Sequence, residues 1–427
     1  MTDFDTVVVG AGSSGCALVG RLAALSDESI CLVEAGPDYG PLVDGRWPAE
    51  LLDARRFPAT HDWGWFETRD GELRRESRAK VVGGCSAHNQ CAALWPEPAE
   101  LDAWGVEGWD ARSVADSRRR VDEAVAPRPH PELASWQRAF VEAAVAAGYG
   151  DSVGPFVANV RDGIRWNSAF AFLDPVRDGV TVLGDTVADR LLLDGDRAVE
   201  LVCSTGPVAA RRFVLCAGTF ASPGILARSG IRPAGLGANL HDHCGMAVSF
   251  APMPRAADAL AADLECGTFH QSQVVLRTRH LHVAPFHSRT DDGWSFGILA
   301  FDLAPRSRGR LEPNVDPLAS PTIDFGFLSD PADAPVLEDA LGVVRAIARR
   351  TPLVDLVAGE VGTTLTGYAH AVGTCRLNEV VNPSCRVRGT SNVFVADASI
   401  IPTIPRANPN LLCFLIGDRA AELIAAT

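Results

Sequence analysis

The chain has 427 residues, of which 47% are hydrophobic and 22% charged, and its formal net charge is -14. This composition is that of a folded protein rather than a disordered one, and the length predicts more than one core. The negative charge argues against nucleic acid or an anionic membrane as a partner. No apolar run reaches the roughly 18 residues that a bilayer crossing needs. The first predicted strand begins too close to Met1 for a signal peptide, so we expect a cytoplasmic protein.

The first forty residues carry a dinucleotide-binding pattern. A β-branched run over 4–9 leads into Gly10-Ala11-Gly12-Ser13-Ser14-Gly15 and a helical stretch, and a second apolar run over 30–33 ends at Glu34. Gly10 allows a tight turn, Gly12 allows the backbone to approach a pyrophosphate, and Gly15 allows the helix to pack closely on the strand. The helix N-terminus offers N–H groups to phosphates, and Glu34 can accept hydrogen bonds from a ribose. The pattern alone leaves FAD and NAD both open.

The rest of the chain alternates between helical and strand-like segments. Apolar periodicity and Pro-rich breaks predict helices over 97–104, 111–125 and 134–147. Short apolar runs predict strands with turns over 180–183, 191–193, 199–202 and 213–218. Apolar and polar residues alternate over 245–330, which predicts antiparallel strands that cover a site. An amphipathic helix is predicted over 336–349.

Six motifs in order carry a resemblance to a known family. They occupy residues 10–15 with 34–36, 80–89, 216–223, 237–243, 370–375, and 395–402 followed by 408–410. In this order they resemble the glucose-methanol-choline (GMC) flavoprotein oxidoreductases. The stretch Gly83 to Asn89 is similar to that of the choline oxidase and dehydrogenase subgroup. The resemblance implies FAD as the cofactor and an alcohol (CH–OH) as the substrate.

The same resemblance implies an α/β fold with an α+β second domain. A Rossmann-like FAD domain would take residues 1–145, 181–250 and 369–427, and a shortened antiparallel-sheet substrate domain would take 146–180 and 251–368. The residues implied for FAD binding are Gly10, Gly12, Ser13, Ser14, Gly15, Glu34, Ala35, Gly83, Gly84, Ser86, His88, Asn89, Val187, Ala217, Gly218, Asp397, Ala398 and Asn410.

His88 and His370 are the two histidines to which the resemblance gives chemical roles. In choline oxidase the histidine equivalent to His88 bonds to the flavin 8α-methyl, so we expect either that bond or a contact with the ring edge. His370 stands at the catalytic histidine, and an imidazole with a pKa near ~6.5 suits the base that removes the hydroxyl proton. Hydride would pass to flavin N5. The partner of His370 would be Asn408 or Asn410, and the Asn-Pro pair favours Asn408.

The expected substrate contacts depart from choline oxidase. Glu265 lies in a Glu-x-Gly-x-Phe context that matches the carboxylate facing the ammonium there, but no aromatic wall surrounds it. Gln90 replaces a serine, Ala369 replaces a tyrosine, and the chain is shortened between about 250 and 370. The pair His241 and His243 has zinc-like spacing but falls in a family loop, so we expect no metal. Choline itself is therefore not supported as the substrate.

Two other functions stay open at this point. One is a GMC dehydrogenase of the kind that accompanies the redox cofactor mycofactocin and reoxidises a reduced carrier. The other is a flavin-binding protein without alcohol chemistry, against which the intact His370 and Asn408 speak. The sequence does not decide between O₂ and a carrier as electron acceptor, or between a monomer and a homodimer.

Overall fold

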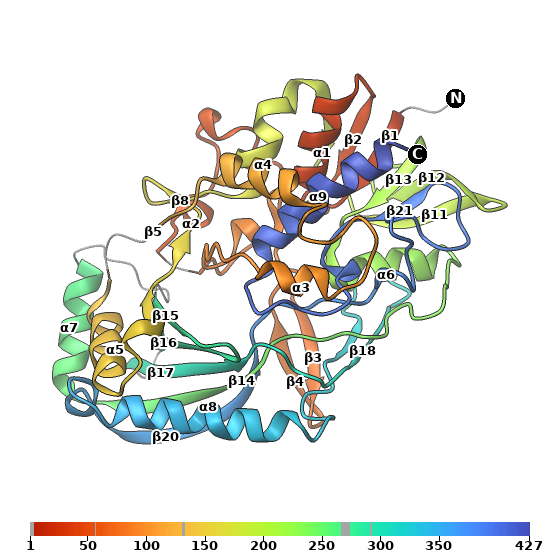
Figure 1. Cartoon of the computed structure of the whole chain (residues 1–427). Coiled ribbons are helices and arrows are strands. Elements are labelled where there is room, and N and C mark those ends of the chain that lie inside the picture. The colour runs from red at the N-terminus through yellow and green to blue at the C-terminus, as the bar shows by residue number, and fades with distance from the viewer. Residues whose placement is uncertain (1–3, 56, 130–132, 266–273, 291–292) are drawn as a thin grey trace.

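The computed structural model describes residues 4–427 apart from 56, 130–132, 266–273 and 291–292. Two large sheets occupy opposite halves of the molecule, one in the upper and one in the lower part of Figure 1. No helix in the described part of the chain is long and apolar enough to cross a membrane.

The upper sheet is parallel at its centre. Its strand order in the described chain is β10-β2-β1-β13-β12-β11, and β21 pairs with the end of β13. The parallel strands are β1 (Phe4–Val9), β2 (Ile30–Val33), β10 (Val180–Leu183), β13 (Val208–Leu215) and β21 (Val393–Val395). The antiparallel strands β11 (Ala188–Asp194) and β12 (Arg197–Cys203) extend it. The apolar, β-branched runs form these strands because helices and loops bury both faces of a parallel sheet.

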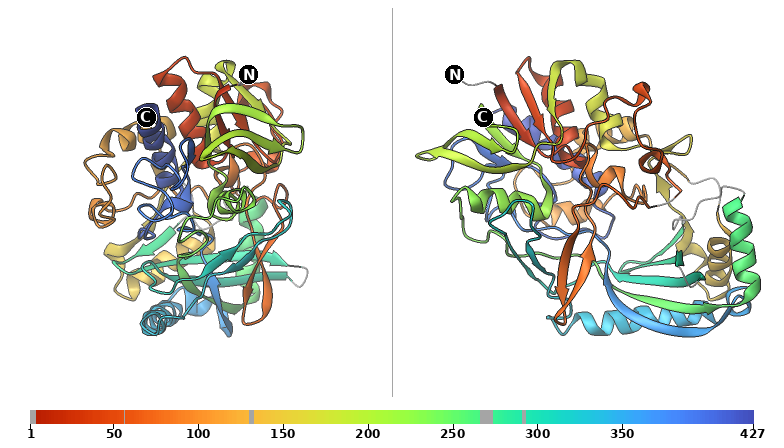
Figure 2. Two further views of the ribbon diagram at one scale, coloured as in Figure 1. Left: turned by 90° about the vertical axis from the view of Figure 1, so that its right-hand side faces the viewer. Right: turned by 180° about the vertical axis from the view of Figure 1, so that it is seen from behind.

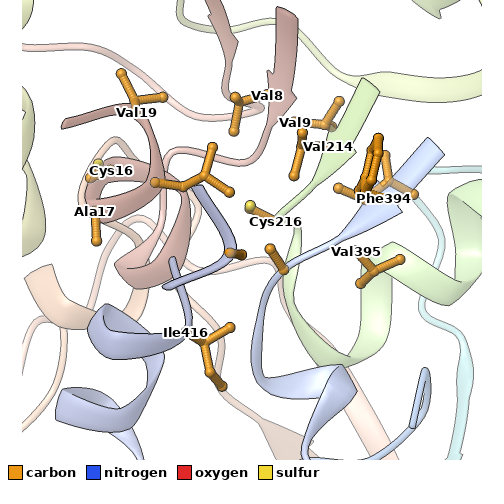
Figure 3. Close-up of a cluster of buried hydrophobic side chains, with 14 of the residues drawn as sticks. Val8, Val9, Cys16, Ala17, Val19, Val214, Cys216, Phe394, Val395 and Ile416 are labelled. Carbon is orange, nitrogen blue, oxygen red and sulfur yellow. The ribbon is translucent and has the colours of Figure 1, made fainter. Parts of the chain in front are cut away.

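Helices α1 (Ser13–Leu25) and α9 (Asn410–Ala425) pack against each other beside this sheet. A Cβ atom at Gly417 would lie 2.1 Å from the Ser14 carbonyl oxygen, so only glycine permits this close approach. Figure 3 shows their shared core, in which Val8 of β1, Cys16 of α1 and Ile416 of α9 meet side chains from β13 and β21. The first and last helices of the described chain thus pack as one unit.

The lower sheet is antiparallel, in the order β20-β14-β17-β16-β15-β6. The strands are β6 (Val153–Pro155), β14 (Cys244–Pro252), β15 (Val274–Arg277), β16 (Leu281–Thr290), β17 (Gly293–Asp302) and β20 (Val357–Gly367). Strand β17 alternates: Phe296, Ile298 and Ala300 pack against α5 (Ser135–Ala146) and α8 (Asp333–Ala348). Leu299 and Phe301 therefore face the other way, into the molecule.

A smaller ribbon connects the two halves. Strands β3 (Trp65–Arg69) and β4 (Glu72–Glu76) form a hairpin that pairs with β19 (Thr322–Asp324) and β18 (Arg310–Glu312). Both views of Figure 2 show its orange strands running from the upper half into the lower one. The remaining α-helices of the described chain are α2 (Ala49–Leu52), α3 (Pro98–Asp102), α4 (Ala115–Val125), α6 (Gly218–Arg228) and α7 (Pro254–Glu265).

The expected α/β fold is confirmed, and the five expected helices correspond to α1, α3, α4, α5 and α8. Among the elements that were not expected are two helices and a hairpin. Helix α7 interrupts the segment predicted as strands alone, because its Ala-rich sequence favours a helix. Helix α9 was not predicted because it is apolar on nearly every face and so lacks the amphipathic period of a surface helix. The β3–β4 hairpin turns at Asp70-Gly71, both with positive φ, which is a hairpin signal readable from sequence.

The division into two domains stays a proposal, and the packing favours moving its boundaries. Helix α5 packs on the lower sheet and β14 belongs to it. The helical turn Ala169–Leu173 joins the upper core instead.

Candidate active site

One cavity of about 930 Å³ is lined by residues from both halves of the molecule. All residues expected to bind FAD line it except Gly15, Gly83 and Ser86. These three lie behind its wall. A Cβ at Gly15 would meet the Gly10 carbonyl oxygen at 1.9 Å, and the Ser86 hydroxyl donates to the Gly83 carbonyl at 2.6 Å. They shape the backbone that the lining residues present.

Two glycine turns meet at the upper end of the cavity. Gly10 has a φ of 100°, and a Cβ on Gly84 would lie 2.5 Å from the Gly12 Cα, so side chains are excluded where the two loops touch. Glu34 sits at the end of β2 and accepts hydrogen bonds from the backbone N–H groups of Ala11 (2.9 Å) and Gly36 (3.0 Å). Burial raises the pKa of Glu34 to about 7.

The C-terminal motifs reach the same end. The Asp397 carboxylate accepts from the Gly218 N–H at 2.8 Å and from the Ser222 hydroxyl at 2.5 Å, which fixes the loop before α6. Asn410, the first residue of α9, accepts from the Ser13 hydroxyl at 3.0 Å. Its buried amide nitrogen has no hydrogen-bond partner among the described residues.

His88 lies farther along the cavity wall and is 9% exposed. Its Nε2 is 2.6 Å from the Thr60 carbonyl oxygen. A carbonyl can only accept, so Nε2 carries the proton and Nδ1 carries the lone pair. Burial lowers the pKa of His88, which favours this neutral form.

His370 follows β20 and is held from several sides. Its backbone N–H donates to Asp242 at 3.0 Å. Its ring lies 4.2 Å from the Tyr368 ring, between centroids. Its Nε2 is 3.1 Å from the amide nitrogen of Asn408, and its Nδ1 is 3.0 Å from Nδ1 of His243. Burial, followed by the charges of neighbouring His243 among others, holds the pKa of His370 well below its usual value.

Asp242, His241 and His243 form a buried polar cluster next to His370. Burial raises the pKa of Asp242 to about 8. One ligand atom each from Asp242, His243 and His370 lie within 4.8 Å of one another. The ring nitrogens of both histidines already have hydrogen-bond partners. His241 accepts from the Ile404 N–H at 3.0 Å and ties this loop to the segment that precedes Asn408.

Part of the cavity wall is apolar and aromatic. Phe301 of β17 stacks on Tyr368 with ring centroids 3.8 Å apart and planes 6° apart. Leu299 lines the cavity beside it. Trp63 and Trp65 also line it and stack at 4.8 Å. We therefore expect an apolar or aromatic group to bind at this end.

The three expected substrate contacts are placed differently. Gln90 and Ala369 line the cavity. Glu265 ends α7, but its side chain and residues 266–269 lie outside the described residues. Ala369 has a φ of 62°, a left-handed conformation that is unusual for alanine.

Three residues of the site were missed from the sequence: Tyr368, Phe301 and His243. Position 369, where choline oxidase has a tyrosine, is alanine, and Tyr368 supplies a ring from the preceding position. A tyrosine two residues before His370 was the signal available. His243 stands in the motif over 237–243 and was interpreted only as part of a structural loop, and Phe301 is far from His370 in the chain with no local pattern to link them.

Comparison with known proteins places these observations together. Residues 4–245 and 305–417 match the N- and C-terminal family models described as GMC oxidoreductase. Choline oxidase of Arthrobacter globiformis is 30% identical over 99% of this chain and 94% of its own length. That alignment runs over 522 residues against 427 here, which agrees with the expected shortening.

Two further proteins are similar over almost their whole lengths. The 5-(hydroxymethyl)furfural oxidase of Methylovorus sp. strain MP688 is 27% identical over 99% of both chains. The crystal structure of pyridoxine 4-oxidase from Mesorbium loti shares the fold, with a TM-score of 0.83 and 23% identity over 99% of both chains.

Proposed function

The chain belongs to the GMC oxidoreductase family, the FAD-dependent enzymes of CH–OH donors, and from this we propose that it oxidises an apolar or aromatic alcohol to a carbonyl. The observation that carries the proposal is the position of His370. Its Nε2 lies 3.1 Å from the Asn408 amide nitrogen, in a cavity that joins the glycine turns to the aromatic wall. A base, a hydrogen-bond donor and an apolar surface thus adjoin the expected cofactor site.

The residues at the upper end fit FAD. The turn from Gly10 to Gly15 and the start of α1 present backbone N–H groups, as a pyrophosphate requires. Glu34 can accept from a ribose, and the unpartnered amide nitrogen of Asn410 is a donor still available at this end. When bound, FAD supplies the acceptor for the hydride that leaves the alcohol carbon.

His370 and Asn408 would both act on the substrate oxygen, His370 as the base and Asn408 as a hydrogen-bond donor. The O–H bond breaks as its proton moves to Nε2 of His370, and the Asn408 N–H donates to the oxygen on which negative charge develops. The lowered pKa of His370 keeps the base unprotonated at neutral pH. Phe301 and Tyr368 exclude water beside it, and this strengthens both interactions.

The charges around the cavity support an uncharged substrate rather than choline. Among the described residues that line it, the carboxylates are Glu34, Asp397 and Asp316. Glu34 and Asp397 hold backbone N–H groups at the upper end. The positive charge of Arg78 lies close enough to His370 to lower its pKa. The aromatic rings at this end could contact a quaternary ammonium group, but its positive charge would meet Arg78 there rather than Glu34 or Asp397.

His88 supports a covalent link to FAD in one respect. With Nε2 donating to Thr60, the unprotonated Nδ1 is the nitrogen available to bond the flavin 8α-carbon. A bond through Nδ1 would leave the contact with Thr60 intact.

The proposal is tested by anaerobic flavin reduction with benzyl alcohol and with choline. The variant His370→Ala should reduce its flavin about 10²–10⁴-fold more slowly while retaining FAD. The exposed His280→Ala is the matched control and should react at the wild-type rate. Benzyl alcohol should give a higher kcat/KM than choline. A wild-type rate in His370→Ala overturns the role of the base, and a preference for choline overturns the substrate class.

A further inference from the structure

We propose that His243 is a positioning residue that keeps the proton of the His370 ring on Nδ1 and so leaves Nε2 free to act as the base. The inference rests on the proposed function, because it concerns the same base. It follows from three consecutive contacts between Pro405, His243, His370 and Asn408, in which only one arrangement of protons satisfies every partner.

The first contact fixes the proton of His243. Its Nε2 lies 2.9 Å from the Pro405 carbonyl oxygen, which can only accept a hydrogen bond. Nε2 must therefore carry a proton. The ring is fully buried, and burial lowers the pKa of His243 to about 4, so the ring is neutral near pH 7. A neutral ring with a proton on Nε2 has its lone pair on Nδ1.

The second contact passes this constraint to His370. The Nδ1 atoms of the two rings are 3.0 Å apart, and the rings meet edge-on at 87°. One of these nitrogens must donate, and Nδ1 of His243 has no proton to give. The proton therefore sits on Nδ1 of His370, which leaves the lone pair on Nε2.

The third contact agrees with this arrangement. The group 3.1 Å from Nε2 of His370 is the amide nitrogen of Asn408, a donor that suits a lone pair. The opposite tautomer would set two donors against each other here and two lone pairs against each other at His243. Both are costly in a buried site.

Other charged or titratable groups near His370 do not bond its ring nitrogens in the described chain. Asp242 accepts from the backbone N–H, and Tyr368 packs against the ring face. His282 and Arg78 lower the pKa of His370 without a hydrogen bond to its ring. His243 is thus the group that selects the tautomer.

The same contact gains strength during the reaction. When Nε2 takes the proton from the alcohol, His370 becomes a cation whose Nδ1–H still donates to His243. A hydrogen bond with one charged partner is roughly twice as strong as a neutral one. His243 therefore stabilises the protonated base more than the resting one.

The test compares two substitutions of similar size in the FAD-loaded enzyme. His243→Asn keeps an acceptor oxygen at the place of Nδ1, whereas His243→Leu removes it. His282→Leu is the control, because His282 is buried near His370 without a hydrogen bond to it. ¹⁵N NMR of histidine-labelled protein, assigned with His370→Gln, reports which nitrogen of His370 carries the proton.

Wild type, His243→Asn and His282→Leu should carry the proton on Nδ1, and His243→Leu should shift it toward Nε2. Flavin reduction in His243→Leu should be about 10–100-fold slower at little changed KM, with partial recovery in His243→Asn. The inference is overturned if His243→Leu keeps the Nδ1 proton, or if His243→Asn loses it equally. If His243→Leu does not fold, a wild-type spectrum without the Nδ1 proton overturns it. The proposed function fails separately, when His370→Ala reacts at the wild-type rate.

Discussion

Replacing Asn408 or Asn410 by alanine should have different effects, because the two side chains lie at different ends of the cavity. Asn408 contacts Nε2 of His370 at 3.1 Å, whereas Asn410 contacts the Ser13 hydroxyl at 3.0 Å, where the FAD phosphates are expected. Asn408→Ala removes a donor to an oxygen that gains negative charge, worth about 1.5–3 kcal/mol. Because each 1.36 kcal/mol of activation free energy changes a rate about tenfold, the flavin reduction rate should fall about 10- to 150-fold.

The assay is anaerobic stopped-flow reduction at saturating alcohol, together with FAD content after desalting. Asn408→Ala should retain FAD and reduce it slowly. Asn410→Ala should lose FAD more readily and, once reloaded, reduce it close to the wild-type rate. If Asn410→Ala with full FAD content is the slower of the two, the donor to the substrate oxygen has been assigned to the wrong residue.

Three further outcomes can be measured. Because burial lowers the pKa of His370, the acid limb of flavin reduction should lie below pH 6.5, and a limb at or above that value would count against the buried base. Acid precipitation should leave flavin in the pellet for wild type and in the supernatant for His88→Asn; colourless wild-type pellets would exclude the covalent bond. Burial also lowers the pKa of His282 to about 3, so the unfolded chain binds a proton at pH 5 that the folded chain does not. Between pH 7 and pH 5 the unfolding free energy in urea should fall about 2 kcal/mol more for wild type than for His282→Leu, and equal falls would contradict this.

The cofactor end of the site was largely predictable because its residues lie in short contiguous motifs. The glycine turn, Glu34 and the stretch around His88 each carry their geometry in a few neighbouring residues, and the fold brings them to one cavity. The choice between Asn408 and Asn410 could not be made from spacing. Pro409 and the start of α9 turn these two side chains toward different partners.

The alcohol end depended on contacts between distant segments. His243 meets His370 only because β14 and β20 pair side by side, and Phe301 reaches Tyr368 from the neighbouring strand β17. Tyr368 was not predicted because the sequence offered no sign of the left-handed conformation at Ala369, which lies between it and His370. Alternation along a strand predicts which face a residue occupies, but it does not say which strand lies alongside.

The pairing of α1 with α9 also has a consequence for how the protein is made. Strand β1 and helix α1 leave the ribosome early. Helix α9, which packs on α1, and strand β21 are synthesised only after nearly all of the rest of the described chain. At about 5–20 residues per second, the nascent first strand waits on the order of tens of seconds for them. During that time the apolar face of α1 that packs against α9 is uncovered, and FAD has no complete site to bind. Loading with cofactor is therefore a late event in biogenesis, and chaperones are expected to matter most before it.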